Sequence, residues 1–349
     1  MPELIVTNFN RNFTGVSATA AGVVRAQMQM GRYDMVLAGV ALPGCPPPIS
    51  RAKARALSRC SPPNRAFTIW HVRRNSEMRA ALWARDVLRL PIRIVFTSAA
   101  QRRHSAFPRW LISRMDAVIA TTETAASFVP HVRAVVPHGV DCARFTPADN
   151  RTAAWAATGY PGIRGIATIG RIRPEKGSDR FVAAMIELLP RCPGVTALLI
   201  GRAAKSDQGF LDALKQKIAA AGLSDRILFP GEIAPDDLPA LMRGLSAVVQ
   251  LPRYEGYGMA PLEGMASGVP FVATDAGYYR CFSCDGTTGV IVPEDAPRDT
   301  ADAIARMLGD ATAHAGMARA ARAAAQARFS IDAEAEGIAA VYDMLWNAG

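Results

Sequence analysis

Residues 245–274 combine a buried strand, a glycine-rich turn, a helix and a second apolar strand. The run LSAVVQLP (245–252) has the continuous apolar pattern of a strand that is buried on both faces. EGYGMAPLE (255–263) follows it, and FVAT (271–274) ends the unit. Strands and helices alternate in this way along the whole chain, which favours parallel sheets with right-handed crossovers. The sequence therefore predicts an α/β protein.

The glycine-rich turn brings two carboxylates to the start of a helix. If that helix begins at about Met259, Glu263 lies one turn into it and Glu255 stays in the loop before it. Backbone amides that point out of a helix N-terminus favour a phosphate, whereas carboxylates repel one. We therefore expect the glutamates to accept hydrogen bonds from hydroxyls, and a diphosphate between two polyols is a nucleotide sugar. A glycine-rich turn with two solvated glutamates is the alternative. The amides are those of Gly256, Tyr257, Gly258 and Met259.

A second candidate segment lies earlier in the chain, after the apolar strand 166–169. Gly170 and Arg171 follow this strand directly, and Lys176 comes just before an amphipathic helix. Arg171 and Lys176 thus lie at the carboxyl end of a strand, where open α/β sheets bind their ligands. Only 5 of the 40 basic residues are lysines, so a lysine in this loop is unusual for this chain. Salt-bridge partners or solvated loop charges remain the structural alternative.

Together the two segments resemble the signature of glycosyltransferase family 4 within the GT-B superfamily. The signature is carried by GRIRPEKGSD (170–179) and EGYGMAPLEGMASGVPFVATDAG (255–277). The similarity extends to HGVDCARF (138–145), ILFPGEIAPDDLPALM (227–242), DGTTGVIVP (285–293) and RFSIDAEAEGIAAVYDML (328–345). The N-terminal half is similar, more narrowly, to α-proteobacterial lipopolysaccharide core mannosyltransferases. That similarity is carried by TNFNRNFTGVSAT (7–19), WHVRRNSEM (70–78) and VFTSAAQRRHS (95–105).

The resemblance implies the GT-B architecture, in which two Rossmann-like domains face each other across a cleft with their parallel sheets. A chain of 349 residues exceeds one typical core, which agrees with two domains. We expect an acceptor-binding domain over 1–150 and a donor-binding domain over 151–330. A last helix over 331–349, with Asp332 as its cap, is expected to return to the first domain.

Transfer of a hexosyl group breaks the anomeric C–O bond while negative charge grows on the leaving diphosphate. Arg171 and Lys176 are predicted to neutralise this charge, with help from the amides after Glu255. Glu263 is predicted to hold the ribose hydroxyls and Glu255 a hydroxyl of the donor sugar, which makes Arg171, Lys176 and Glu255 the catalytic candidates. Ile233 is predicted to lie beside the base. Gly15, at the start of another helix, is predicted to let the backbone approach the donor.

The sequence calls for no metal or other cofactor. Asp236 and Asp237 precede a helix and are expected to cap it, so no Asp-x-Asp pair stands in a plausible donor loop. The resemblance implies that the anomeric configuration is retained. No carboxylate stands out as a covalent nucleophile, so our hypothesis is front-face attack with the leaving phosphate as base.

Candidates on the acceptor side follow the predicted strands of the N-terminal half. His71, Arg73 and Arg74 lie near the end of the strand 67–71, and Arg11 follows the first strand. The wider family usually places a histidine near position 99 to contact the donor sugar, and here alanine occupies that position. His104 either replaces that histidine or packs against its own loop.

The charge of the chain is concentrated in its N-terminal part. Residues 1–150 contain 20 basic and 8 acidic side chains, a net charge of +12, although the whole chain carries +10. Such a surface attracts anionic lipid headgroups and also suits an acceptor that bears phosphates and carboxylates. An arginine-rich composition with an ordinary solvated surface is the alternative, but it does not explain the asymmetry. We expect a cytoplasmic protein that associates with the inner face of the cytoplasmic membrane.

Several function classes can be weighed against each other. The sequence contains no apolar run of 18 residues, and its six cysteines form no disulfide or zinc pattern, which fits a reducing compartment. A nucleotide-sugar epimerase on the same architecture is one alternative to a transferase. A nucleic-acid-binding protein is another, suggested only by the pI of about 9.7. We expect no nucleic-acid partner, because no such motif stands on the basic half.

Overall fold

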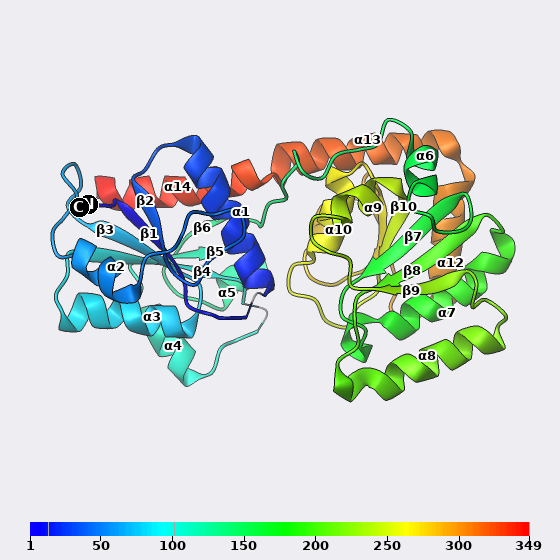
Figure 1. Cartoon of the computed structure of the whole chain (residues 1–349), viewed down its shortest axis with the longest axis horizontal. Helices are drawn as coiled ribbons and strands as arrows, with labels where there is room; N and C mark the ends of the chain where they lie inside the picture. The colour runs from blue at the N-terminus through cyan, green and yellow to red at the C-terminus, as the bar shows by residue number, and fades with distance from the viewer. Residues whose placement is uncertain (13, 101, 349) are drawn as a thin grey trace. The chain divides into compact units, whose positions relative to one another are not determined.

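The structure is a computed structural model that describes residues 1–12, 14–100 and 102–348, and within these residues the strands form two six-stranded sheets (Figure 1). Phe13, Gln101 and Gly349, which fall within the family-like segments 7–19 and 95–105 and the expected last helix 331–349, lie outside the described residues. The chain divides into unit 1, Met1–Gly139 with Phe329–Gly349, and unit 2, Val140–Arg328. The sequence placed these divisions at residues 150 and 330.

Unit 1 contains a parallel sheet with the strand order β2-β1-β3-β4-β5-β6. The central strand β1 pairs with β2 on one side and with β3 on the other, so that Leu4 aligns with both Met35 and Ile69. The order reverses between β1 and β3, which makes this pair the topological switch point. The strands are β1 (Leu4–Asn8), β2 (Met35–Gly39), β3 (Thr68–Val72), β4 (Ile92–Ser98), β5 (Ala117–Ala120) and β6 (Val132–Val135).

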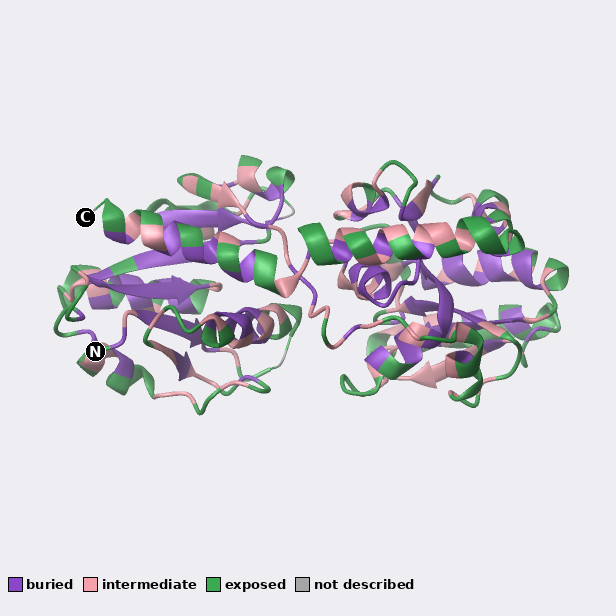
Figure 2. Cartoon of the chain, turned by 90° about the horizontal axis from the view of Figure 1, so that it is seen from above, coloured by how far each residue is buried: buried purple, intermediate pink, exposed green. Residues whose placement is uncertain are grey.

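Alternation along the strands of unit 1 builds a core on each face of the sheet. Leu4 and Val6 of β1 pack on one face with residues of α1 and α14, whereas Ile5 packs on the other with α3 and α4. Both faces are covered, which explains why the strands of this unit are predominantly buried (Figure 2). The helices are α1 (Gly15–Met30), α2 (Arg51–Leu57), α3 (Asn75–Leu82), a π-helical turn η1 (Trp83–Val87), α4 (Ala106–Ser113), α5 (Glu123–Ser127) and α14 (Ile331–Asn347).

Unit 2 contains a second parallel sheet, with the different strand order β12-β11-β10-β7-β8-β9. Its switch point lies between β7 and β10, which pair in parallel. The strands are β7 (Arg164–Ile169), β8 (Val195–Ile200), β9 (Ile227–Gly231), β10 (Leu245–Gln250), β11 (Phe271–Thr274) and β12 (Gly289–Val292). The helices are α6 (Arg151–Ala156), α7 (Ser178–Leu188), α8 (Gln208–Ala220), α9 (Leu238–Gly244), α10 (Met259–Ala266), α11 (Tyr279–Ser283), α12 (Pro297–Gly309) and α13 (Ala311–Arg328), and the short 3₁₀ turns are η2 (Pro174–Lys176), η3 (Leu189–Arg191) and η4 (Lys205–Asp207).

Two predicted helix caps are wrong. The cap of α14 is Ser330, whose hydroxyl accepts a hydrogen bond from the amide of Ala333, whereas Asp332 lies inside the first turn. Asp237 stands at the N-cap of α9 without a side-chain cap bond. Asp236 instead forms an ion pair with Arg144 at 3.0 Å, because a nearby guanidinium competes with the helix N-terminus for the carboxylate.

The strands β6 and β12 were not predicted. Both are four residues long and lie at a sheet edge, where a strand needs less continuous apolar sequence. Across the part of the chain that the structure describes, none of the helices is both long and apolar enough to span a bilayer.

Candidate functional site

The switch point of unit 2 brings the two candidate segments together. Residues 170–177 leave the carboxyl end of β7, and residues 251–258 leave the carboxyl end of its neighbour β10. The chain continues from β7 to one side of the sheet, whereas β10 lies on the other side, so the two loops separate above a crevice. Segments that are about eighty residues apart in the sequence therefore meet at one edge.

The two loops are held against each other by close packing and by arginine side chains. Gly177 has a φ of +69°, and a Cβ atom at this position would lie 1.8 Å from the carbonyl oxygen of Leu251. Arg253 donates to the carbonyl oxygen of Pro174 at 2.6 Å and forms a bidentate pair with Asp179 at 2.7 and 2.8 Å. The position of the loop after β7 is thus determined by the loop after β10.

Lys176 and Glu255 form an ion pair at this junction, and Nζ of Lys176 lies 2.7 Å from Oε2 of Glu255. The amide of Gly256 donates to Oε1 of the same carboxylate at 2.8 Å, and the Tyr279 hydroxyl is also hydrogen-bonded to it. Burial, together with the charge and the hydrogen bond of Glu255, raises the pKa of Tyr279 well above its usual value. The Glu255 carboxylate is therefore held by three donors from three segments.

The turn before α10 requires glycine for steric reasons. Gly258 has a φ of +98°, and a Cβ atom there would lie 2.0 Å from the ring of Tyr279. α10 begins at Met259, as the sequence predicted. The ring of Tyr257 is buried and stacks on Tyr278 with 5.3 Å between centroids, so only its backbone faces the turn. The amide of Gly256 bonds to Glu255, which removes it from the donors that were expected to point outward.

Arg171 is exposed and makes no hydrogen bond or ion pair with another described residue. It lies with Lys176 around a small cavity at the end of β7. Gly170 has a φ of +152°, and its carbonyl oxygen lies close to Gly201, the residue after β8. A Cβ atom on Gly201 would contact this oxygen. Arg171 is thus positioned by a tight backbone crossing and keeps all its donors for solvent or a ligand.

Glu263 lies in the second turn of α10 and forms no hydrogen bond with another described side chain. Burial raises the pKa of Glu263 to about 7, although the charge of Arg144 acts in the opposite direction. The side chain is half-buried, and its carboxylate has no hydrogen-bond donor among the described residues, so it is free to accept hydrogen bonds from a ligand.

Replacement of Glu263 by glutamine is expected to raise the stability of the protein at alkaline pH. The pKa of Glu263 in the folded state, about 7, lies above the unfolded value of about 4.5. The stability of the parent is therefore unaffected by this carboxyl below about pH 4.5 and decreases as the pH rises from 4.5 to about 7. The difference in unfolding free energy between Glu263→Gln and the parent should therefore grow from pH 5 to pH 8, by on the order of 1–3 kcal/mol. Urea unfolding at both pH values measures it, with the exposed Glu187→Gln as control. A constant difference would show that Glu263 is ionised throughout.

Ile233 follows the edge strand β9 and is partly exposed. Its neighbour Glu232 forms a solvent-exposed ion pair with Arg202 at 3.4 Å. Since β9 is separated from β7 by β8, Ile233 lies farther along the carboxyl edge of the sheet than the ion pair of Lys176.

The switch point of unit 1 gathers several of the predicted acceptor-side residues. Arg74, just after β3, donates to Asn8 at the end of β1 at 2.9 Å, to Glu77 at 3.1 Å, and to Ser17 in α1 at 2.8 Å. These bonds use most of the guanidinium donors, so Arg74 joins the two switch-point loops and is less available to a ligand than the sequence suggested. Arg11 is exposed in the loop after β1.

His71 lies inside β3 rather than after it and is completely buried, which corrects the prediction for this residue. One ring nitrogen lies 2.7 Å from the Thr97 hydroxyl and the other bonds to the Tyr342 hydroxyl, so the ring is occupied within unit 1. Burial and the charge of Arg73 hold the pKa of His71 well below its usual range. A neutral, enclosed imidazole is a packing element of this core.

Arg73, His104 and Gly15 remain compatible with a binding role in unit 1. Nη1 of Arg73 and Nε2 of His104 are buried and have no hydrogen-bond partner among the described residues. Burial lowers the pKa of Arg73. A Cβ atom on Gly15 would meet nothing within 4 Å, so neither packing nor backbone strain explains this glycine.

Sequence reasoning missed Tyr279, Arg253 and Arg180. Arg180 donates to Asp295 at 2.7 Å and to the carbonyl oxygen of Pro252 at 3.3 Å, which adds to the attachment of the loop after β10. Their positions depend on contacts between distant segments. The run TDAG (274–277) after β11 was the available signal, because a glycine there approaches Glu255 closely.

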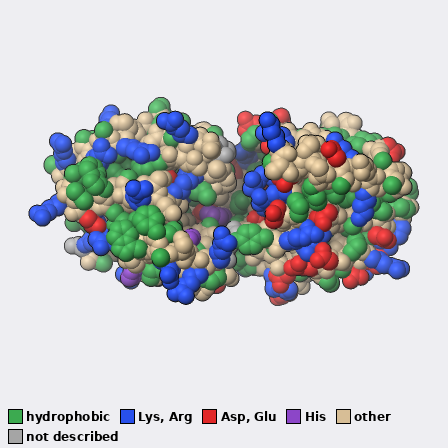
Figure 3. Space-filling view, turned by 90° about the horizontal axis from the view of Figure 1, so that it is seen from below, with side chains coloured by type: hydrophobic (Ala, Val, Ile, Leu, Met, Phe, Trp, Pro, Cys, Tyr) green, Lys and Arg blue, Asp and Glu red, His purple; other side chains and the backbone are tan. Residues whose placement is uncertain are grey.

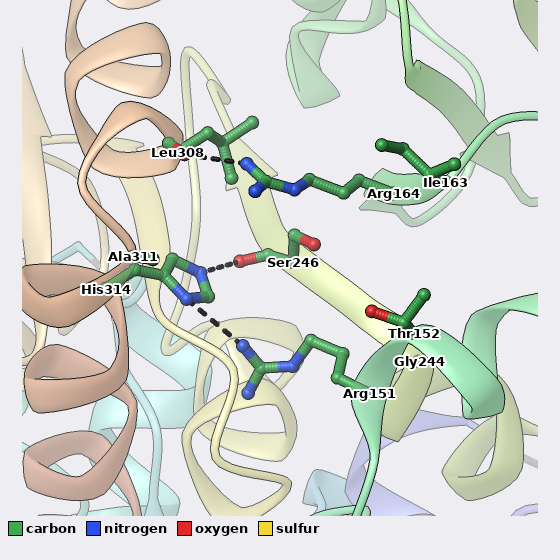
Figure 4. A pocket seen from close by; sticks show the side chains of 9 residues that line it. All are labelled: Arg151, Thr152, Ile163, Arg164, Gly244, Ser246, Leu308, Ala311 and His314. Carbon is green, nitrogen blue, oxygen red and sulfur yellow. Dashed lines mark hydrogen bonds between the residues drawn. The ribbon is translucent and has the colours of Figure 1, made fainter.

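A polar pocket of about 150 Å³ lies at the opposite, amino-terminal edge of the same sheet (Figure 4). Arg164, the first residue of β7, donates to the carbonyl oxygen of Leu308 at 2.6 Å, and His314 bonds to the carbonyl oxygen of Ser246 at 2.7 Å. These side chains bind the ends of neighbouring elements. The pocket lies at the amino-terminal ends of the strands, whereas the candidate site lies at their carboxyl ends, so the two are separate.

Comparisons with known proteins identify the family of this chain. The family model described as "Glycosyl transferases group 1" matches residues 163–324. The chain is 40% identical over 345 residues to the lipopolysaccharide core biosynthesis mannosyltransferase LpcC of Rhizobium leguminosarum bv. viciae, covering 98% of this chain and 96% of that protein. It is 40% identical over 348 residues to LpsB of Rhizobium meliloti, a protein of the same description, with coverages of 98% and 97%.

A similar fold has been solved in Anabaena Alr3699/HepE in complex with UDP, with a TM-score of 0.81, 18% identity and coverages of 98% of this chain and 100% of that one. This likeness concerns the fold alone. The relatives match the chain along nearly its whole length. The chain therefore belongs to the group 1 glycosyltransferase family, and it is a glycosyltransferase with the GT-B fold.

Proposed function

We propose that this glycosyltransferase moves a hexose from a nucleotide diphosphate sugar to an anionic lipopolysaccharide inner-core acceptor, with retention of the anomeric configuration. The choice of mannose rests on the relatives described as lipopolysaccharide core mannosyltransferases. The observation that carries the donor class is the junction of Lys176, Glu255 and the N-terminus of α10 at the switch point of unit 2. It offers a cation and the N-terminal end of a helix to a diphosphate and a carboxylate to hydroxyls.

The chemistry of transfer assigns a task to each of these groups. As the glycosidic C–O bond breaks, Lys176 and the exposed Arg171 neutralise the charge that develops on the leaving diphosphate. Glu255 leaves Lys176 to accept a hydrogen bond from a sugar hydroxyl, and the half-buried Glu263 carboxylate, which has no donor among the described residues, accepts hydrogen bonds from the ribose hydroxyls. The base lies beside Ile233. A phosphate oxygen of the leaving group takes the acceptor proton. Because Arg171 and Lys176 stabilise the charge of the leaving group, the proposed reaction requires no metal.

The acceptor is proposed to bind at the switch point of unit 1. The unpartnered Nη1 of Arg73 and the exposed Arg11 are the cations available to its phosphates or carboxylates. The excess of positive charge in residues 1–150 supports an anionic acceptor and, in addition, association with an anionic membrane surface on the cytoplasmic side.

Incubation with a panel of nucleotide sugars and with lipid A bearing inner-core acid sugars tests this function. We expect release of the nucleoside diphosphate only when both the matching donor and the acceptor are present, and NMR of the product should show the anomeric configuration of the donor. Release without acceptor, or interconversion of the donor sugar, would instead indicate a hydrolase or an epimerase.

Chelation provides a separate test of the metal-independent mechanism. We expect the transfer rate in excess EDTA to equal the rate in added Mg²⁺ or Mn²⁺, because cationic side chains stabilise the leaving group. Loss of transfer in EDTA with recovery on metal addition would contradict the assignment of this role to Arg171 and Lys176 alone.

A further inference from the structure

Unit 1 carries an apolar groove of about 780 Å³ on its surface. The groove is formed by α3, the π-helical turn η1 and α4, which cover one face of the sheet. Five of the eleven large hydrophobic residues that are exposed in the described chain lie in or beside it. These five are Trp83 (45% exposed), Val87 (63%), Leu88 (40%), Phe107 (53%) and Trp110 (54%).

Two of the elements that form the groove, α4 and η1, have apolar side chains both on the side that faces the core and on the side that faces outward. In α4, Leu111 and Ile112 are buried in the core, whereas Phe107 and Trp110, three residues apart, face outward and stack at 6.3 Å. In η1, Ala84 is buried while its neighbour Trp83 faces outward. A surface helix that is apolar on its outer side as well contacts a second apolar phase.

Arginines surround this apolar surface. Arg51, Arg79 and Arg114 line the groove, and Asp86, which pairs with Arg114 at 2.9 Å, is the acid among its lining residues. Arg55 lies over the ring of Trp83 at 5.2 Å and Arg114 lies 5.7 Å from the ring of Trp110, so cations stand directly beside the exposed aromatic rings. Figure 3 shows this kind of surface on unit 1, where hydrophobic side chains are flanked by Lys and Arg.

We infer that this aromatic–arginine surface inserts into the interfacial layer of an anionic lipid bilayer. Tryptophan rings concentrate at the level of the lipid headgroups, and arginines place their apolar stems in the layer while their guanidinium groups bind phosphates. The positive charge of the surface is complementary to anionic lipid. The exposed aromatic rings add an apolar contact with the bilayer, which charge alone does not provide. The inference deepens the proposed membrane association, because it names the surface and replaces simple electrostatic adsorption by insertion.

Brominated lipids test the insertion directly. Trp70, Trp155 and Trp346 are buried, so quenching of fluorescence by brominated phosphatidylglycerol–phosphatidylcholine vesicles should report on Trp83 and Trp110. We expect quenching that Trp110→Phe reduces by about half. Absence of quenching in vesicle-bound protein would overturn the inference.

Vesicle flotation distinguishes insertion from adsorption. The double variant Phe107→Ser, Trp110→Ser should bind vesicles at least tenfold more weakly in both 0.1 M and 0.5 M NaCl. The control Met344→Ser, an exposed residue of α14 on the other face of the sheet, should bind like the parent. Equal binding of the double variant and the parent, lost entirely at high salt, would overturn insertion and leave only electrostatic association. A shift from oligomer to monomer in the double variant, without vesicle binding by the parent, would assign the surface to self-association and also overturn it.

Transfer to a delipidated core oligosaccharide separates this inference from the proposed function. The double variant should transfer sugar to this soluble acceptor at the rate of the parent. On acceptor embedded in vesicles, it should lose most of the increase in transfer rate that membrane binding gives the parent. If the parent transfers no sugar from any donor while it still inserts, the proposed function fails and the surface stands.

Discussion

Replacement of Lys176 by alanine is expected to lower the transfer rate by about 10²–10³-fold while the fold remains intact. Lys176 is the cation that the structure places in the junction with Glu255, at 2.7 Å, and we propose that it neutralises the leaving diphosphate. The pair is partly exposed, so its removal should change stability by no more than about 1 kcal/mol. Steady-state kinetics with saturating donor, together with thermal unfolding, measures both effects.

Lys205→Ala is the matched control for this experiment. Lys205 is an exposed lysine of unit 2 in the turn before α8, so its loss removes the same charge away from the junction. We expect the control to retain the parental rate. A near-parental rate for Lys176→Ala would remove this residue from the mechanism, whereas an equal loss in both variants would indicate a general effect of net charge.

Replacement of Gly177 by alanine is expected to destabilise unit 2 by about 2–4 kcal/mol and to abolish most activity. Two costs add at this position: a left-handed φ of +69°, and a Cβ atom that would lie 1.8 Å from the carbonyl oxygen of Leu251. The loops after β7 and β10 must separate to make room. Because Lys176 precedes Gly177 directly, this movement also breaks the junction with Glu255. Urea unfolding gives the loss of stability.

Gly222→Ala isolates the contribution of the close contact. Gly222 has nearly the same φ, +67°, but a Cβ atom there would meet nothing within 4 Å. Alanine at this position should therefore cost only about 1 kcal/mol, from the backbone alone. Equal destabilisation by the two substitutions would mean that the loops yield easily and that their packing does not position Lys176.

Most of the fold was predictable because long apolar runs determine the central strands. The run 245–250 and the alanine-rich stretch 311–328 specify their elements locally, and both match the structure. The edge strand β12 is specified by its pairing with β11, which leaves little trace in four residues. The cap of α14 depends on whether Ser330 or Asp332, two residues apart, adopts the extended backbone, and local sequence does not decide this.

The candidate site was predictable to the extent that its residues follow strands. The ends of β7 and β10 predicted that Lys176 and Glu255 approach each other, although not that they form an ion pair. Tyr279 reaches the site from α11, and Arg253 fixes the loop after β10 by its pair with Asp179, so only the tertiary structure shows either contact. His71 shows the converse error, since a polar residue near a strand end can also be satisfied inside the core.

If the donor binds here as we propose, the three donors around Glu255 favour one class of ligand over others. Lys176 already has an anionic neighbour, so an incoming phosphate must exchange with that carboxylate rather than occupy a vacant charge. Pyrophosphate alone would displace Glu255 from Lys176 without donating a hydrogen bond to the carboxylate. A molecule with both phosphate and hydroxyl groups provides an anion for Lys176 and a hydrogen-bond donor for Glu255. In the proposed reaction, the carboxylate is free to pair with Lys176 again once the sugar has been transferred, and this pairing favours release of the nucleotide. The exchange between phosphate and Glu255 at Lys176 would thus accompany both the binding of the donor and the release of the nucleotide, and it would increase the turnover rate.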